Sequence, residues 1–293
     1  MNLFSLQRLA ACVLPLLLAA CGGGGGDGDS SVATLSAANV GYGKTTTLTV
    51  NGSKLNAGLT AAIEPGCLTM APTTASSTSA TFTCRITAVG DLRVRVRTAE
   101  GAELATLRLD VPVPQVRITA KQGNTTGSFV VELDPAKAPN TVLNFLSYVN
   151  SSSTSFYVNT LFHKIVPGSA MYAGTYNTGP ALKTNSRSPV ALEANNGLKN
   201  LRGTIAMFHG SNPDSATSQF FINLVDNPAF DYVDAANPGY AVFGSVIVGL
   251  TETVDLIATV PTTTKTATIG GVATTFENIP STNVTISAIL QIR

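Results

Sequence analysis

The chain has 293 residues, which is enough for two ordinary domains. Its net charge of +1 and pI of about 7.6 give no electrostatic reason to expect a nucleic-acid partner. Charged residues make up only 12% of the chain, against roughly 25% in a typical soluble protein, and a surface of Thr, Ser, Asn and Gly indicates an extracytoplasmic protein.

Residues 1–20 are predicted to form a signal peptide. Arg8 precedes a short apolar run, LAACVLPLLLAA, which Pro15 interrupts. The run is too short to cross a hydrocarbon core about 30 Å thick as a helix. It is therefore typical of a cleaved signal and not of an anchor helix.

The residues LAAC, ending at Cys21, resemble the lipobox of bacterial lipoproteins. The resemblance implies cleavage before Cys21, a diacylglycerol on its thiol, and a flexible glycine-rich tether over residues 21–31. The alternative is an ordinary signal peptide followed by an incidental cysteine. Because Gly22 stands where many inner-membrane lipoproteins have Asp, we expect a lipid anchor on the periplasmic side of the outer membrane.

Two cysteines remain, because Cys12 leaves with the signal peptide and Cys21 is the lipid site. An even pair in an oxidising compartment predicts a disulfide between Cys67 and Cys84. Free thiols and a metal half-site are the alternatives. We expect no metal, since the two histidines lie far along the chain and tetrahedral zinc takes four ligands.

Residues 32–113 are predicted to form a small β-sandwich. Apolar and polar residues alternate in 81–87, 91–99 and 106–111, as in antiparallel strands with one solvated face. Cys84 has the apolar phase, so its bridge would be buried. The stretch TLTVNGSKL resembles the start of immunoglobulin-like IPT modules. No catalytic constellation stands out, and the unit is expected to be a spacer or a binding module.

The prolines of VPVPQV mark a boundary, after which residues 114–293 form a second domain. Residues 115–133 predict a β-hairpin, and 134–150 predict a helix with Pro139 in its first turn. A short helix is expected at 251–260. Many strands with two helices predict a closed antiparallel barrel with helical caps. The other expected strands are 161–166, 203–208, 218–224, 240–248 and 283–292.

Five motifs of this second domain occur in the order seen in bacterial cyclophilins, which the chain resembles over about residues 115–293. They are GSFVVELDPAKAPNTVLNFLSYV, FHKIVPG, EANNGLKNLRGTIAM, SATSQFFINLVDN and YAVFGSVIVGL. The resemblance implies an all-β fold, an eight-stranded antiparallel barrel capped by two helices. It also implies cis–trans isomerisation of X–Pro bonds without metal or cofactor, acting on proline-containing peptides or folding proteins.

This reaction needs no nucleophile. Rotation about the X–Pro bond faces a barrier of about 18–20 kcal/mol, because resonance gives the C–N bond double-bond character. The twisted transition state has a lone pair on the proline nitrogen, so a donor placed there stabilises that state selectively. An apolar pocket must hold the ring, and polar groups must hold the flanking backbone.

The motif that supplies the donor usually reads F-H-R-[IV]-I-x-G-F-M-x-Q-G-G in the family and is altered here. Lys164 stands at the position of the donor Arg, and Ser169 replaces a Phe. Ala170 replaces the Met of the proline pocket, and Tyr172 replaces a Gln. His163 is kept. The alternatives are a solvated strand-edge charge for Lys164 and a buried hydrogen-bonding histidine for His163.

The resemblance assigns the remaining site residues to later motifs. Gln219 would hold the substrate backbone, and His163 would lie on the substrate side. Phe221 would floor the proline pocket unless it is ordinary core. Phe230 stands where Leu is common, Tyr240 where bacterial members often have Tyr, and Phe208 where Ala is usual. His209 follows in the stretch that pairs with substrate, or lies on the loop surface.

Lysine does not replace arginine fully, because its ammonium group is mobile and strongly hydrated whereas a guanidinium is a preorganised fork. The first hypothesis is therefore a weak, membrane-tethered prolyl isomerase that assists folding in the periplasm. The second is a non-catalytic binder of proline peptides, or a scaffold, that retains the barrel.

Overall fold

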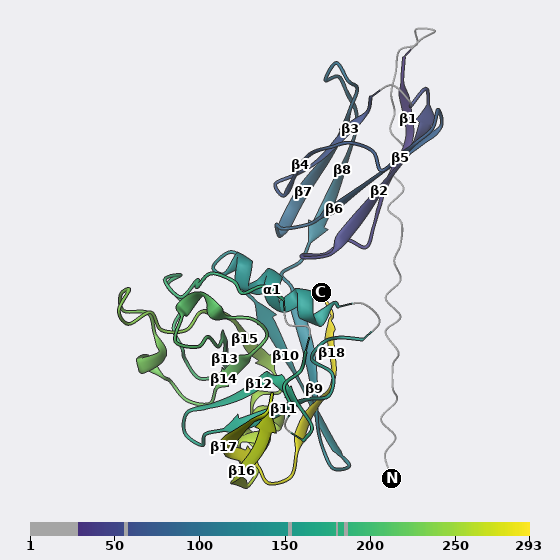
Figure 1. Ribbon diagram of the computed structural model, residues 1–293. Coiled ribbons are helices and arrows are strands. Elements are labelled where there is room, and N and C mark those ends of the chain that lie inside the picture. The colour runs from purple at the N-terminus through teal and green to yellow at the C-terminus, as the bar shows by residue number, and fades with distance from the viewer. Residues whose placement is uncertain (1–28, 56–57, 152–153, 180, 185–186) are drawn as a thin grey trace, which may run out of the picture. The chain divides into compact units, whose positions relative to one another are not determined.

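A computed structural model of the chain describes residues 29–293, apart from 56–57, 152–153, 180 and 185–186 (Figure 1). The predicted signal peptide and Cys21 lie outside the described residues. Within them, no helix has the length and apolar character needed to cross a membrane. The chain divides into two compact units: one runs to Ile86 and includes Gly90–Val111, and the other comprises Thr87–Val89 and Pro112–Arg293.

The N-terminal unit contains two four-stranded antiparallel sheets, in the strand orders β1-β2-β6-β5 and β4-β3-β7-β8. The alternation predicted for these strands is confirmed, because Leu92, Val94 and Val96 are buried while Arg93 between them is exposed. The strands are β1 (Ser31–Ala38), β2 (Thr45–Ser53), β3 (Thr60–Glu64), β4 (Cys67–Met70), β5 (Thr74–Ala75), β6 (Ser79–Arg85), β7 (Gly90–Arg97) and β8 (Glu103–Val111).

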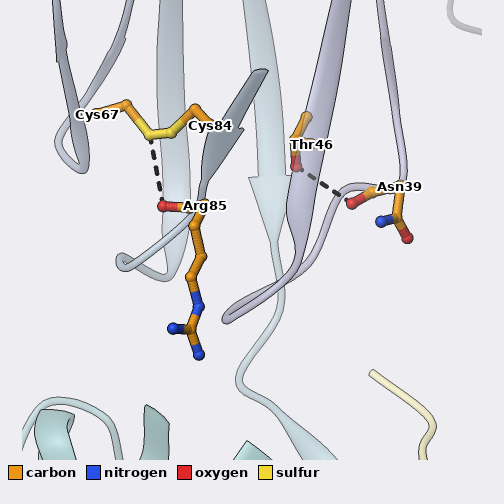
Figure 2. The surroundings of a disulfide bond; sticks show 5 residues. All are labelled: Asn39, Thr46, Cys67, Cys84 and Arg85. Carbon is orange, nitrogen blue, oxygen red and sulfur yellow. Dashed lines mark hydrogen bonds between the residues drawn. A yellow bond between two sulfur atoms is a disulfide. The ribbon is translucent and has the colours of Figure 1, made fainter. Parts of the chain in front are cut away.

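A disulfide joins Cys67 of β4 to Cys84 of β6 and so links the two sheets (Figure 2). The Cα atoms of the two cysteines are 6.2 Å apart. Cys84 is buried, as its phase in the strand predicts. The Cys67 sulfur lies 3.5 Å from the carbonyl oxygen of Arg85, the residue after Cys84. The bridge therefore fixes the edge strand β4 against the end of β6.

Replacing both Cys67 and Cys84 with serine is expected to destabilise the N-terminal unit by about 3 kcal/mol. The reason is that the bridge closes a loop with a sequence separation of 17 residues, which restricts the unfolded chain. Urea unfolding of both proteins measures the difference. Intact-mass analysis after thiol labelling, with and without reductant, checks the bridge itself. Two labelled thiols in unreduced protein would show that the bridge is absent.

The second unit is a closed antiparallel barrel of eight strands, in the order β10-β15-β13-β14-β12-β11-β18-β9, with β9 paired to β10. This confirms the predicted fold class. The strands are β9 (Gln115–Gln122), β10 (Thr125–Leu133), β11 (Thr160–Ile165), β12 (Ala170–Asn177), β13 (Thr204–Met207), β14 (Phe220–Asn223), β15 (Val242–Val248) and β18 (Val284–Gln291).

Two helices pack on the barrel. Helix α1 (Pro139–Val149) begins at Pro139, which needs no hydrogen-bond partner in a first turn. It buries Phe145, whose ring centroid lies 5.6 Å from that of Phe220 and 5.2 Å from that of Phe243. The predicted helix at 251–260 is shorter than expected: a π-helical turn, Leu250–Val254, leads into α2 (Asp255–Ala258).

The sequence patterns did not predict strand β12 or the hairpin of β16 (Thr262–Ile269) and β17 (Val272–Pro280). The two hairpin strands pair only with each other and carry many threonines, so they lack the apolar alternation of a barrel strand. Gly270 and Gly271 form the tight turn, both with positive φ. Figure 1 shows this hairpin beside β11 and β12, and β17 packs on β11.

Candidate active site

One row of residues runs across five neighbouring strands of the barrel. Lys164 pairs with Tyr172, Tyr172 with Phe221, Phe221 with Ala206, and Ala206 with Val242. Side chains directly opposite each other share a face of the sheet. Lys164, at one end of this row, is exposed, so the shared face is the outer one. The FHKIVPGSAMY and SQFF motifs therefore meet on the outside of the barrel.

A β-bulge lies at His163. Phe162 pairs with Ala173 and Lys164 with Tyr172, so His163 is the extra residue on β11. A bulge interrupts the strict alternation of side chains and redirects one of them. Here it allows the neighbouring residues His163 and Lys164 to line the same cleft, together with Gln219.

Phe221 lies at the centre of an aromatic cluster and is fully buried. Its ring centroid is 5.2 Å from that of Tyr172, 5.6 Å from Phe230 and 5.3 Å from Tyr240. Phe208 stacks on Tyr240 at 5.7 Å. Ala170 belongs to the same cluster and is also buried. The space around Phe221 is therefore filled by aromatic rings.

Lys164 is the cation of this residue row, and it contacts the aromatic cluster through Tyr172. Its Nζ lies 5.5 Å from the centroid of the Tyr172 ring, within the range of a cation–π contact. Burial, and to a lesser extent the neighbouring Tyr240, raise the pKa of Tyr172 to about 12. Tyr172 therefore stays neutral at physiological pH and acts as a hydroxyl group and an aromatic face.

Gln219 connects the two sides of the site. Its Oε1 accepts a hydrogen bond from Thr175 Oγ1 at 3.3 Å, and its backbone carbonyl accepts one from the Phe208 amide at 2.9 Å. The first contact orients the amide group next to Lys164 in the cleft. The second fixes the strand end that carries Phe208.

The two histidines differ in their surroundings. Burial lowers the pKa of His163 to about 4, so the ring is neutral at pH 7, and its Nδ1 has no hydrogen-bond partner. Both ring nitrogens of His209 lie 2.7 Å from carbonyl oxygens, those of Gly210 and Gly239. His209 is buried and packs on Tyr240, so the loop-surface alternative for it is wrong.

A sequence model described as "Cyclophilin type peptidyl-prolyl cis-trans isomerase/CLD" matches residues 116–288, which is more than half of the chain. The chain belongs to this cyclophilin family. The match spans nearly the whole barrel, including every strand of the residue row. The expected family and its fold are therefore confirmed.

Curated relatives agree with this assignment. A peptidyl-prolyl cis-trans isomerase of Acinetobacter baylyi is 47% identical over 138 residues, 47% of this chain and 70% of the relative. Isomerase A of Dickeya dadantii is 42% identical over 164 residues, 56% of this chain and 79% of the relative. Isomerase B of Escherichia coli is 42% identical over 138 residues, 46% of this chain and 81% of the relative.

Among solved structures, a cyclophilin-type isomerase of Cryptosporidium parvum is 22% identical to the chain. The alignment covers 61% of this chain and 98% of that one, with a TM-score of 0.47.

The predicted site residues of the cyclophilin barrel fall into three groups. Ala170, Tyr172, Phe208, Phe221, Phe230 and Tyr240 form the aromatic cluster. The adjoining cleft is lined by Lys164, His163 and Gln219. His209 packs on Tyr240 of the cluster. Their roles toward substrate stay predictions. Tyr176 and Phe276 also line the cleft and were not predicted, although the Gly270–Gly271 turn is a recognisable hairpin signal.

Proposed function

We propose that this cyclophilin is a slow, lipid-anchored prolyl isomerase. Membership of the family supplies the reaction, cis–trans isomerisation of the peptide bond that precedes proline. The reduced rate is inferred from the residue row. Lys164 occupies the end of this row, next to Tyr172, which in turn pairs with Phe221. A cation is thus retained at the site, but without the planar fork of donors that arginine offers.

The reaction follows from this placement. A proline ring would rest against Phe221, and Gln219 would hold the neighbouring backbone. Lys164 would donate to the proline nitrogen when rotation frees its lone pair, which stabilises the twisted state more than the planar one. Because Phe221 is fully buried, Tyr172 or Phe208 has to turn aside before a ring can enter. This step lowers the apparent affinity for peptide.

The covered Phe221 also favours the second candidate, a barrel kept as a scaffold or as a weak binder of proline peptides without catalysis. Magnetisation-exchange NMR on the peptide Ala-Pro-Phe distinguishes the two, using the chain without its first 21 residues. Exchange above the uncatalysed rate supports the isomerase. Peptide binding with exchange at the uncatalysed rate supports the binder, and the absence of both leaves only the scaffold.

The proposed location is the periplasmic face of the outer membrane, with the lipid on Cys21 and clients that are folding proteins. The support is the LAAC sequence before a glycine-rich stretch, together with a disulfide of the kind that forms in oxidising compartments. The N-terminal unit would then be a spacer or a binding module of immunoglobulin-like type between the anchor and the barrel.

Cys21→Ser is expected to abolish lipidation and to release most of the protein from washed membranes, because serine lacks the thiol that would carry the diacylglycerol. Mass spectrometry of the mature N-terminal peptide from wild-type cells should show the mass of a diacylglycerol on Cys21. Cys12→Ser is the matched control and should be lipidated normally. Mature wild-type protein without acyl mass would contradict the anchor.

A further inference from the structure

The β16–β17 hairpin and strand β11 enclose a cleft beside the aromatic cluster. Its volume is about 310 Å³, enough for a side chain and part of a backbone. Hairpin residues form one wall and barrel residues the other. The lining residues are His163, Lys164, Tyr176, Phe208, Gln219, Thr274, Thr275, Phe276 and Glu277.

A stack of rings holds the hairpin against the barrel. The Tyr176 ring centroid is 4.8 Å from that of His163 and 4.9 Å from that of Phe276, both in edge-to-face geometry. Phe276 is buried although its strand is mostly exposed. The base of the cleft is therefore formed by the packed rings of His163, Tyr176 and Phe276.

His163 contributes an unsatisfied polar atom to this cleft. The side chain is only 5% exposed, and its Nδ1 has no hydrogen-bond partner. Within the described part of the chain, Thr98 Oγ1 is the one other buried side-chain atom in this condition. Leaving such a group unpaired costs the free energy of its desolvation, so a ligand that supplies a partner gains affinity.

We propose that this cleft is a second substrate subsite, which takes a neutral amide or hydroxyl side chain close to the proline of a bound peptide. The inference rests on the proposed function, because Phe208 lines the cleft and also packs in the cluster around Phe221. Two other lining residues connect to that cluster: Lys164 pairs with Tyr172, and the Gln219 carbonyl accepts from the Phe208 amide. A peptide with its proline on Phe221 therefore passes the mouth of the cleft.

The charges of the cleft favour a neutral group. Lys164 and Glu277 both line it and both are exposed, so a charged side chain of either sign meets one like and one opposite charge and gains no net attraction. His163 is uncharged at pH 7, as burial keeps its pKa near 4. Gln219, Thr274 and Thr275 add neutral hydrogen-bonding groups. Glutamine or asparagine has the reach, and its amide offers both a donor and an acceptor, so it can pair with His163 Nδ1 in either tautomer of the ring.

The test compares Ala-Ala-Pro-Ala-Ala with four peptides that carry Gln at one of the four alanine positions, by magnetisation-exchange NMR. At one position Gln is expected to raise kcat/KM about tenfold over the alanine peptide. Glu and Lys at that position should give smaller gains. The readout is the ratio of kcat/KM for the Gln peptide to kcat/KM for the alanine peptide. A variant that changes the rate for both peptides equally leaves this ratio unchanged.

Three variants locate the effect. His163→Phe removes the ring nitrogens but keeps an aromatic group against Tyr176, and Thr275→Trp fills the cleft from the exposed strand face; each should bring the ratio close to one. Val272→Ala, at an exposed position on the same hairpin and outside the cleft, should leave the ratio unchanged. A ratio that survives both cleft variants overturns the proposal.

The outcome separates the subsite from the proposed function. If wild-type protein exchanges the alanine peptide but no Gln position raises kcat/KM, the subsite is wrong and the isomerase stands. If no peptide is exchanged, the proposed function fails, and NMR titration with the same peptides decides the subsite alone. Equal affinities for the Gln and Ala peptides in that titration would overturn it.

Discussion

Alanine in place of Lys164 is expected to lower kcat/KM for Ala-Pro-Phe by roughly 10- to 100-fold, and arginine is expected to raise it about tenfold. One preorganised donor is typically worth roughly 10²–10³ in rate. A mobile ammonium group recovers part of that, so the wild-type enzyme should lie between the two variants. Tenfold corresponds to about 1.4 kcal/mol of transition-state stabilisation.

The decisive result is the order Arg above Lys above Ala at this position. Lys137→Ala is the matched control, since Lys137 is also an exposed lysine of the barrel unit but lies outside the cleft. Phe208 and Tyr172 border the place where a guanidinium would extend. If Lys164→Arg alone gives no gain, it should be combined with Phe208→Ala and Tyr172→Gln. Equal rates for all three side chains, with peptide still bound, would remove Lys164 from catalysis.

The motifs were sufficient to predict the barrel, because each of them carries one barrel strand. Phe220 and Phe221 show how. Adjacent strand residues face opposite sides, so one packs on Phe145 under helix α1 and the other joins the outer row. The order of strands in the row depends on register between segments far apart in the chain, which the residue pattern did not predict.

The cleft was not predictable in the same way. In a regular strand, His163 and Lys164 would face opposite sides of the sheet. The bulge at His163 changes this, and nothing in the residues FHKIVPG predicts a bulge. The β16–β17 hairpin has exposed threonines on both faces, and only Phe276, Ile279 and Pro280 of its two strands are buried, so its apolar signal is weak. Its packing through Tyr176 is a tertiary contact that local sequence does not encode.

Acid is expected to destabilise the barrel through His163. The pKa of this ring is about 4 in the folded protein, against an ordinary value of 6.5, mainly because burial penalises the charged form; the backbone of Leu161 opposes this shift through a hydrogen bond, and the charge of the adjacent Lys164 adds to it. Between these two values the unfolded chain binds a proton that the folded chain does not. Stability is therefore intact above pH 6.5 and falls as the pH drops toward 4, by about 3 kcal/mol in total.

Two substitutions isolate this effect. His163→Phe and His163→Gln both remove the titrating group, so the free energy of unfolding should fall less steeply from pH 7 to pH 4 than in wild-type protein, whatever its level at pH 7. Tyrosine fluorescence during urea unfolding reports on the barrel unit, because the chain has no tryptophan and every tyrosine except Tyr42 lies in that unit. Carboxylate protonation contributes to all three proteins and cancels in the difference. If the wild-type slope matches both variants, His163 is not the neutral, buried group that the cleft geometry requires.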